Sequence, residues 1–133
     1  MAHKLTSHPA ARGLRGVALA IVLPTALLMG RAAEAHAFLD HAVPGVGSTL
    51  SASPAAVSLW FTEQVEPSFS SVGVSDQSGV RVDAGDATVD PHNGSELRVT
   101  LKPLPPGTYK VSWHVVSVDT HRTEGQFTFT ISR

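Results

Sequence analysis

The residues best suited to chemistry in this 133-residue sequence are Asp119 and His121, a carboxylate and an imidazole separated by Thr120. They follow an alternating stretch over 109–115, which predicts a long β-strand. In an extended chain, side chains two residues apart lie on the same face, so we expect these two groups side by side. A carboxylate oxygen and an imidazole nitrogen both bind divalent metals. Because two ligands do not complete a site, the others must come from another part of the chain.

The first 35 residues have the three regions of a secretory signal peptide. Basic residues come first, the segment 17–29 is nearly all apolar, and Ala33-Glu34-Ala35 is an A-x-A cleavage signal. An apolar segment of 13 residues is too short to cross a bilayer, which takes about 20 residues. We therefore expect a signal peptide over 1–35 and a mature domain over 36–133 with no membrane span, in the periplasm or outside the cell.

Cleavage after Ala35 makes His36 the first residue of the mature chain. A second A-x-A, Ala35-His36-Ala37, lies one step further on and would leave Phe38 first instead, and the sequence does not decide between them. A terminal histidine offers its free amine and a ring nitrogen, which can chelate one metal ion. The amine has an ordinary pKa of about 7.7–8.0, so a metal displaces its proton readily near neutral pH. Together with the Asp-x-His pair, this terminus predicts a metal site.

Composition limits the kind of protein and the kind of metal. The expected mature domain carries six Lys and Arg against ten Asp and Glu, a formal charge of −4. A mildly acidic domain with scattered basic residues argues against binding to nucleic acid. The sequence has no cysteine, and its two methionines, Met1 and Met29, lie in the leader. A soft sulfur site for Cu(I) is therefore not expected in the mature domain.

Short alternating segments separated by Gly- and Pro-rich turns predict an all-β fold, an antiparallel sandwich of about seven strands. The expected strands are 37–43, 57–62, 69–75, 80–82, 97–101, 109–115 and 127–131, with 87–89 as a further short candidate. The expected core residues are Leu59, Phe61, Val72, Val74, Leu97, Val99, Leu101, Tyr109, Val111, Trp113, Phe127 and Phe129.

The mature sequence also contains a set of motifs that are weak singly and specific together. They are His36-Ala37 after the leader, Pro44-x-x-Gly47-Ser48, Leu59-x-Phe61-x-Glu63, Pro106-Gly107-Thr108-Tyr109-x-Val111-x-Trp113 and Val116-Ser117-x-Asp119-x-His121-x-x-x-Gly125. In these motifs the sequence resembles the CopC family of secreted copper-binding proteins, also called copper-resistance or YobA-type proteins. The resemblance covers essentially the whole mature domain.

This resemblance implies an immunoglobulin-like Greek-key β-sandwich or barrel. It also implies one Cu(II) per chain, held by the amine and ring of His36, by Asp119 and by His121, and a separate membrane partner of the CopD type. Nitrogen and carboxylate ligands suit the tetragonal coordination that Cu(II) prefers. Some family members carry a Met-rich Cu(I) site as well, and the absence of methionine after Met29 points to the type with a single Cu(II) site.

Glu63 falls where the family has an acidic residue near the copper, and two interpretations of it have equal weight. In the first, it supports a ligand imidazole through a hydrogen bond, as carboxylates commonly do, or serves as an occasional ligand. In the second, it lies at a solvated strand end. We expect His41, His92 and His114 at the surface. Thr120 and Thr123 flank the Asp-x-His pair, where hydroxyl bonds to the backbone can fix a loop.

The favoured function is an exported, monomeric copper-binding protein for copper homeostasis and resistance, with no catalytic residues of its own. The first alternative is a copper-dependent oxidative enzyme that uses the terminal histidine as its metal grip. The second is a sandwich domain for protein interaction that binds no metal. Peroxide formation with ascorbate tests the first alternative, and isolation without copper favours the second.

Overall fold

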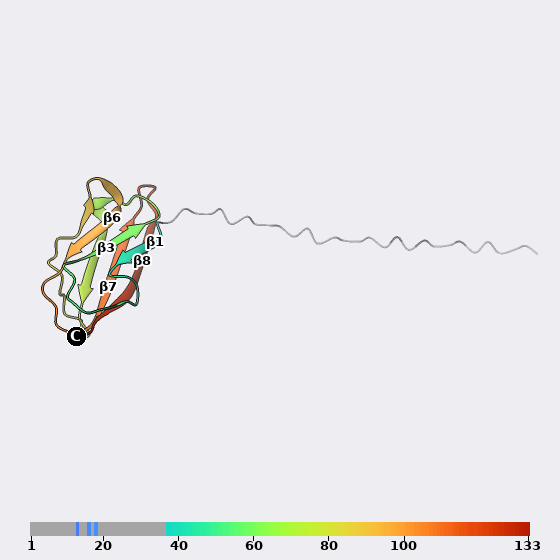
Figure 1. Ribbon diagram of the computed structural model, residues 1–133. Helices are drawn as coiled ribbons and strands as arrows, with labels where there is room; N and C mark the ends of the chain where they lie inside the picture. Colours follow the sequence, from blue (N-terminus) through green and yellow to red (C-terminus); the bar gives the residue numbers. More distant parts are fainter. Residues whose placement is uncertain (1–12, 14–15, 17, 19–36) are drawn as a thin grey trace, which may run out of the picture. The chain divides into compact units, whose positions relative to one another are not determined.

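The computed structural model describes residues 13, 16, 18 and 37–133 (Figure 1). Most of the expected signal peptide and His36 lie outside the described residues. The chain divides into two units, and the second, Ala33–Arg133, contains the folded domain. Its elements are β1 (Leu39–Val43), β2 (Thr49–Leu50), β3 (Ala56–Phe61), η1 (Pro67–Phe69), β4 (Ser71–Ser75), β5 (Thr88–Asp90), β6 (Asn93–Thr100), β7 (Gly107–Val116) and β8 (Arg122–Ile131).

The strands form two four-stranded sheets that pack face to face. One sheet has the order β1-β3-β6-β5 and the other β2-β8-β7-β4. All neighbours are antiparallel except β2 and β8. The connections β3–β4 and β6–β7 cross from one sheet to the other, as in Greek-key sandwiches. The predicted all-β sandwich is therefore confirmed, with eight strands rather than about seven.

The interior is built from the alternating residues of both sheets. Ten of the twelve predicted core residues are buried, and the two exceptions, Leu101 and Trp113, are partly buried and pack against the same cluster. The Trp113 ring makes an edge contact with Phe61 at a centroid distance of 5.1 Å. It lies so close to Gly125 that a Cβ there would meet the indole at 2.6 Å. Glycine at this position of β8 therefore makes room for the tryptophan.

Most strand bounds differ from the expectation, and the largest shift is at β8, which begins at Arg122 rather than at 127. The first strand begins at Leu39 rather than at 37, because Ala37 and Phe38 bond to other segments. The segment 80–82 is not a strand: it forms an isolated bridge through Arg81. The loop after Pro44 contains β2, which pairs with β8 in parallel over two residues.

A hydrogen bond fixes the start of β7. The Tyr109 hydroxyl donates to the carbonyl of Pro105 at 2.6 Å, and the ring stacks on Phe129 at 5.5 Å. A buried tyrosine that bonds to the backbone a few residues upstream is a feature of immunoglobulin-like sandwiches. It ties the Pro-rich turn to the core.

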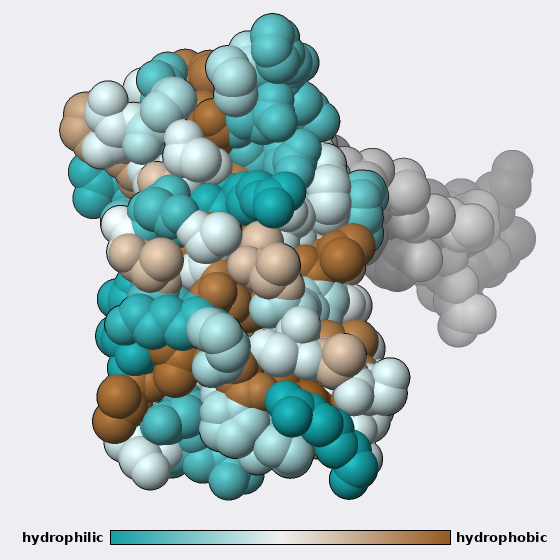
Figure 2. Space-filling view, turned by 60° about the vertical axis from the view of Figure 1, so that its left-hand side comes forward, coloured by the Kyte–Doolittle hydropathy of each residue, from teal (hydrophilic) through white to brown (hydrophobic). Residues whose placement is uncertain are grey.

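The surface mixes polar and apolar side chains. On the face shown in Figure 2, hydrophobic residues occur in scattered spots between polar ones. Among the described residues, no helix is long and apolar enough to cross a membrane. The exposed large apolar residues are Phe38, Val43, Val46, Phe69, Val80 and Val118.

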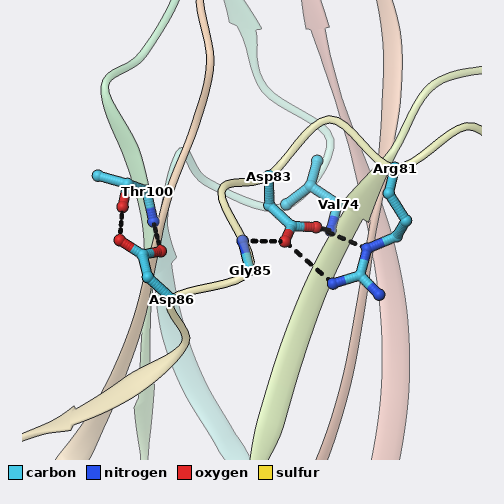
Figure 3. Close-up of polar contacts among 6 residues, drawn as sticks. All are labelled: Val74, Arg81, Asp83, Gly85, Asp86 and Thr100. Atoms are coloured by element: carbon cyan, nitrogen blue, oxygen red, sulfur yellow. Dashed lines mark hydrogen bonds and ion pairs between the residues drawn. The ribbon is translucent and has the colours of Figure 1, made fainter.

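A buried carboxylate, Asp83, holds the connection between β4 and β5 (Figure 3). Its side chain is 1% exposed, and it accepts hydrogen bonds from the N–H groups of Val74 at 2.8 Å and Gly85 at 2.9 Å. The Arg81 guanidinium donates to both of its oxygens, at 2.7 and 3.0 Å. Burial opposes ionisation of this group, but the bonds from Arg81, Val74 and Gly85 outweigh it and lower the pKa of Asp83 to about 2. Asp83 thus acts as a structural anion with satisfied oxygens.

Candidate metal site

Asp119 and His121 lie together in the tight loop that joins β7 to β8. The His121 Nδ1 is 3.2 Å from the Asp119 Oδ2, and the two side chains are 38% and 43% exposed. The expected reason for their proximity was wrong, because they do not lie on an extended strand. The Ser117 N–H donates to the His121 carbonyl at 2.9 Å, and the Thr120 N–H donates to the Ser117 carbonyl at 2.8 Å. Thr120 adopts a positive φ of 73°, so a turn brings the pair together.

The hydroxyl of Ser117, which lies in the interior beneath the exposed loop, bonds to both Asp119 and His121. Ser117 is fully buried, and its hydroxyl donates to the Asp119 Oδ1. The same oxygen accepts the His121 N–H at 3.3 Å. The hydrogen bond from Ser117, with a smaller contribution from His121, holds the pKa of Asp119 below its ordinary value. Asp119 is therefore an anion near neutral pH, as a metal ligand must be.

The segment that follows His36 lies beside this loop. The Thr123 hydroxyl donates to the Ala37 carbonyl at 2.8 Å, and Ala37 is completely buried. The hydroxyl bond to backbone expected for Thr123 is thus confirmed, whereas Thr120 contributes through its backbone. In Figure 1 the described chain begins at the same end of the sandwich as the β7–β8 loop, and the C-terminus lies at the opposite end.

A third segment, 62–66, makes hydrogen bonds both to the N-terminal segment at Phe38 and to the β7–β8 loop at Val118. The Thr62 N–H donates to the Phe38 carbonyl at 2.8 Å, and the Phe38 N–H donates to the Thr62 hydroxyl at 3.0 Å. Two residues on, the Gln64 carbonyl accepts the Val118 N–H at 3.1 Å. Glu63 therefore stands, half-buried, between a contact to the N-terminal segment and a contact to the Asp-x-His loop.

The donor chemistry and spacing of the pair fit a divalent metal. Two ligand atoms that each bind a metal at about 2.0 Å and at a right angle are about 2.8 Å apart, within a few tenths of an ångström of the 3.2 Å found between His121 Nδ1 and Asp119 Oδ2. Within the described residues, no three His, Cys, Asp or Glu side chains gather into a metal-binding group. The described part of the chain thus brings together two side chains, Asp119 and His121, that could each bind a metal.

The other three histidines of the described residues, His41, His92 and His114, lie at the surface, as expected. His41 is exposed, bonds to the Asp40 carboxylate at 2.8 Å and stacks on Trp60 at 4.5 Å. His92 is exposed in the turn before β6. His114 lines a groove of about 640 Å³ on the outer face of β4, β7 and β8, and this groove does not include Asp119 or His121.

Ser117 is the residue of the site that sequence reasoning missed. It was part of a motif, but no role was given to it. A signal was present, because Ser in a turn commonly bonds to groups two to four residues away. Its contacts to Asp119 and to His121 have these separations.

Comparison with known proteins gives the family. The CopC domain family matches residues 39–132. Protein YobA from Escherichia coli (strain K12) is 39% identical over 118 residues, covering 88% of this chain and 95% of YobA. Copper resistance protein C from Escherichia coli is 37% identical over 121 residues, covering 83% of this chain and 94% of that protein. Copper transport protein CutJ from Bacillus subtilis is 32% identical over 114 residues, which are 85% of this chain and 21% of CutJ.

Solved structures agree with the sequence matches. The crystal structure of CopC from Methylosinus trichosporium OB3b superposes with a TM-score of 0.69 at 35% identity, covering 73% of this chain and 94% of that one. The structure of PcoC, a methionine-rich copper resistance protein from Escherichia coli, gives a TM-score of 0.62 at 33% identity, covering 74% of this chain and all of PcoC. The sandwich, the motifs on it and these matches together show that this chain belongs to the CopC family.

Proposed function

We propose that this chain is an exported Cu(II)-binding protein that buffers or delivers copper outside the cytoplasmic membrane, in the periplasm or extracellular space. A leader over 1–35 directs the export, and its removal leaves a one-domain, monomeric protein over 36–133. Relatives named for copper resistance and copper transport support the choice of metal. The Asp119–His121 pair supports the presence of a binding site.

In this proposal the metal ligands are the His36 amine and ring, Asp119 and His121, with Glu63 as a supporting residue. The observation that carries the ligand set is the 2.8 Å hydrogen bond from the Thr123 hydroxyl to the Ala37 carbonyl. It joins the residue after His36 to the residue two positions after His121. Consecutive Cα atoms are about 3.8 Å apart, so Ala37 limits how far His36 can lie from the pair.

The donors favour Cu(II) over Cu(I). Three nitrogens and one carboxylate oxygen suit tetragonal Cu(II), whereas Cu(I) prefers sulfur ligands. PcoC is described as methionine-rich, but this chain has no methionine after Met29 and no cysteine. In this proposal copper is carried and not used in a reaction. It is bound and released through nitrogen and oxygen ligands, without a second site made of sulfur ligands.

The delivery partner in this proposal is a separate membrane copper transporter of the CopD type. Support comes from CutJ, a copper transport protein in which the segment similar to this chain makes up 21% of the length. Relatives named for resistance and transport favour a binding role over an oxidative enzyme.

The decisive experiment starts from the secreted protein. Mass analysis of its N-terminus is expected to show His36 as the first residue. Competition titration is then expected to show one tightly bound Cu(II) per chain. A version that begins at Ala37, and a version with one extra residue before His36, are both expected to bind Cu(II) far more weakly, because each removes the amine–imidazole chelate.

A matched control is His41→Ala, which removes an exposed histidine near the same end of the sequence and is expected to leave the affinity unchanged. A mature protein that begins at Phe38, or equal Cu(II) affinity with and without His36, would overturn the proposed ligand set. Ascorbate-driven peroxide formation by the copper-loaded protein, with cleavage of a polysaccharide, would favour an enzyme instead.

A further inference from the structure

We infer that Ser117 is a positioning residue that selects which oxygen of Asp119 is presented to the metal and orients His121 toward it. The inference rests on the proposed function, because it concerns the same copper ligands. It assigns to one buried hydroxyl the orientation of two partly exposed side chains.

The first argument is the use of the two carboxylate oxygens. The Ser117 hydroxyl donates to the Asp119 Oδ1, and the Oδ2 faces the His121 Nδ1 at 3.2 Å. The His121 carbonyl lies 3.3 Å from the same hydroxyl as a second, more distant acceptor. Because a hydroxyl has one proton to donate, it engages at most one oxygen of Asp119 and leaves the other directed to the imidazole. Asp119 is then presented through a single oxygen. Two-oxygen carboxylate binding, which is common for Ca²⁺, is disfavoured.

The second argument is the connection to His121. The oxygen of the same hydroxyl accepts the His121 N–H at 3.3 Å, while the Ser117 N–H donates to the His121 carbonyl at 2.9 Å. Asp119 and His121 are half-exposed, whereas Ser117 is fully buried. The rigid interior thus orients both exposed ligands through one side chain.

The third argument is that the loop does not depend on the hydroxyl alone. Its backbone bonds from Ser117 to His121 and from Thr120 to Ser117 need no side chain. The Val118 N–H also bonds to the Gln64 carbonyl at 3.1 Å. Removal of the hydroxyl is therefore expected to leave the loop folded and to free the Asp119 carboxylate.

The test compares Ser117→Ala, Ser117→Thr and wild type, all as mature protein beginning at His36. Ser117→Ala is expected to weaken Cu(II) binding by about 10–100-fold, the usual effect of losing a group that orients a metal ligand, and to change the electron paramagnetic resonance spectrum of the bound Cu(II). Ser117→Thr keeps the hydroxyl and is expected to restore both. Ser58→Ala, which removes a buried serine hydroxyl from β3, is the matched control and should alter neither.

A double-variant cycle, in which Cu(II) affinity is measured, distinguishes a positioning role of Ser117 from a merely structural one. With Asp119 already changed to Ala, the further change Ser117→Ala is expected to have much less effect on affinity, because there is no carboxylate left to position. Equal effects in both backgrounds would overturn the inference. So would a folded Ser117→Ala protein with wild-type affinity and spectrum.

If Ser117→Ala does not fold, infrared difference spectroscopy of the wild type on copper addition provides the test. Carboxylate stretching bands typical of one-oxygen coordination are expected, and bands typical of two-oxygen coordination would contradict the inference. Wild-type protein that binds no Cu(II) would instead refute the proposed function, so the two failures are distinguishable.

Discussion

Two aspartates with lowered pKa values stand in contrasting regions of this domain. Asp83 is 1% exposed, and its oxygens accept bonds from Arg81, Val74 and Gly85. Asp119 is 43% exposed, with one oxygen engaged by Ser117 and the other facing His121. Both are anions near neutral pH, but the second has an oxygen directed at an imidazole, that of His121.

The contrast shows that a lowered pKa does not by itself mark a functional carboxylate. At Asp83 the hydrogen bonds use the available lone pairs and fix the protein's own backbone, so the negative charge serves stability. At Asp119 the charge is only partly neutralised, and it remains accessible to a cation. We therefore expect substitution of Asp119 to lower Cu(II) affinity and to leave the domain folded. Substitution of Asp83 is expected to lower the free energy of unfolding and to leave Cu(II) affinity unchanged.

The largest expected effect concerns the pair itself. Asp119→Ala or His121→Ala removes a direct ligand and is expected to lower Cu(II) affinity by about 100-fold or more, since loss of a supporting group alone costs up to that amount. Competition titration measures the affinity, and thermal unfolding without copper checks that the domain remains folded. His114→Ala removes an exposed histidine of β7 and serves as the control. Unchanged affinity in either variant would remove the site from this loop.

The second effect is expected at Asp83. Asp83→Asn removes the charge and places an amide where donors from three groups converge, which is expected to lower the free energy of unfolding by roughly 2–3 kcal/mol. Urea denaturation measures the free energy. Cu(II) affinity of the folded variant should equal that of wild type, and a loss of affinity as large as that of Asp119→Ala would erase the contrast between the two regions.

The third effect is the pH dependence of stability. The pKa of Asp83 is about 2 in the folded protein, below the ordinary value of about 3.9 in an unfolded chain. The unfolded state therefore binds the proton more tightly. The stabilisation is fully present above about pH 4 and is lost as the pH falls toward 2, a change of about 2 kcal/mol. Denaturation of wild type and Asp83→Asn across this range should show the two stabilities converging at low pH, and parallel curves would contradict the assignment.

The smallest effect is expected at the link between the N-terminal segment and the loop. Thr123→Val keeps the shape of the side chain but removes the bond to the Ala37 carbonyl. The expected cost is about 1 kcal/mol of stability, with Cu(II) affinity weakened several-fold because Ala37 is held less firmly. Thr128→Val, at an exposed position of the same strand, is the control. Equal affinity in the two variants would show that this bond does not help to assemble the site.

Local patterns were enough to predict the sandwich, because alternation in segments such as 57–62 and 97–101 directly reflects burial. Two features, the strand β2 and the hydrogen bond of Asp83 to Val74, could not be found in this way. β2 is two residues long and exists through its pairing with β8, a distant contact. The bond of Asp83 joins it to Val74, nine residues away on β4, and local composition does not reveal that bond.

The proximity of Asp119 and His121 was predictable, but the backbone conformation that produces it was not. The spacing of Asp119 and His121 indicated a pair, although a turn with a positive φ at Thr120, rather than an extended strand, makes it. The contact between Thr123 and Ala37 spans 86 residues, and only the three-dimensional fold establishes it. Whether His36 completes the ligand set remains a prediction, since it lies outside the described residues.

The proposed use of the His36 amine, next to the buried Ala37, has a consequence for the timing of copper capture. In the precursor, the nitrogen of residue 36 is part of a peptide bond and has no free lone pair to offer a metal. The proposed chelate can therefore form only after the proposed removal of the leader has freed this nitrogen. Processing would then switch on metal capture, and the newly made chain would not withdraw copper from the cytoplasm on its way out.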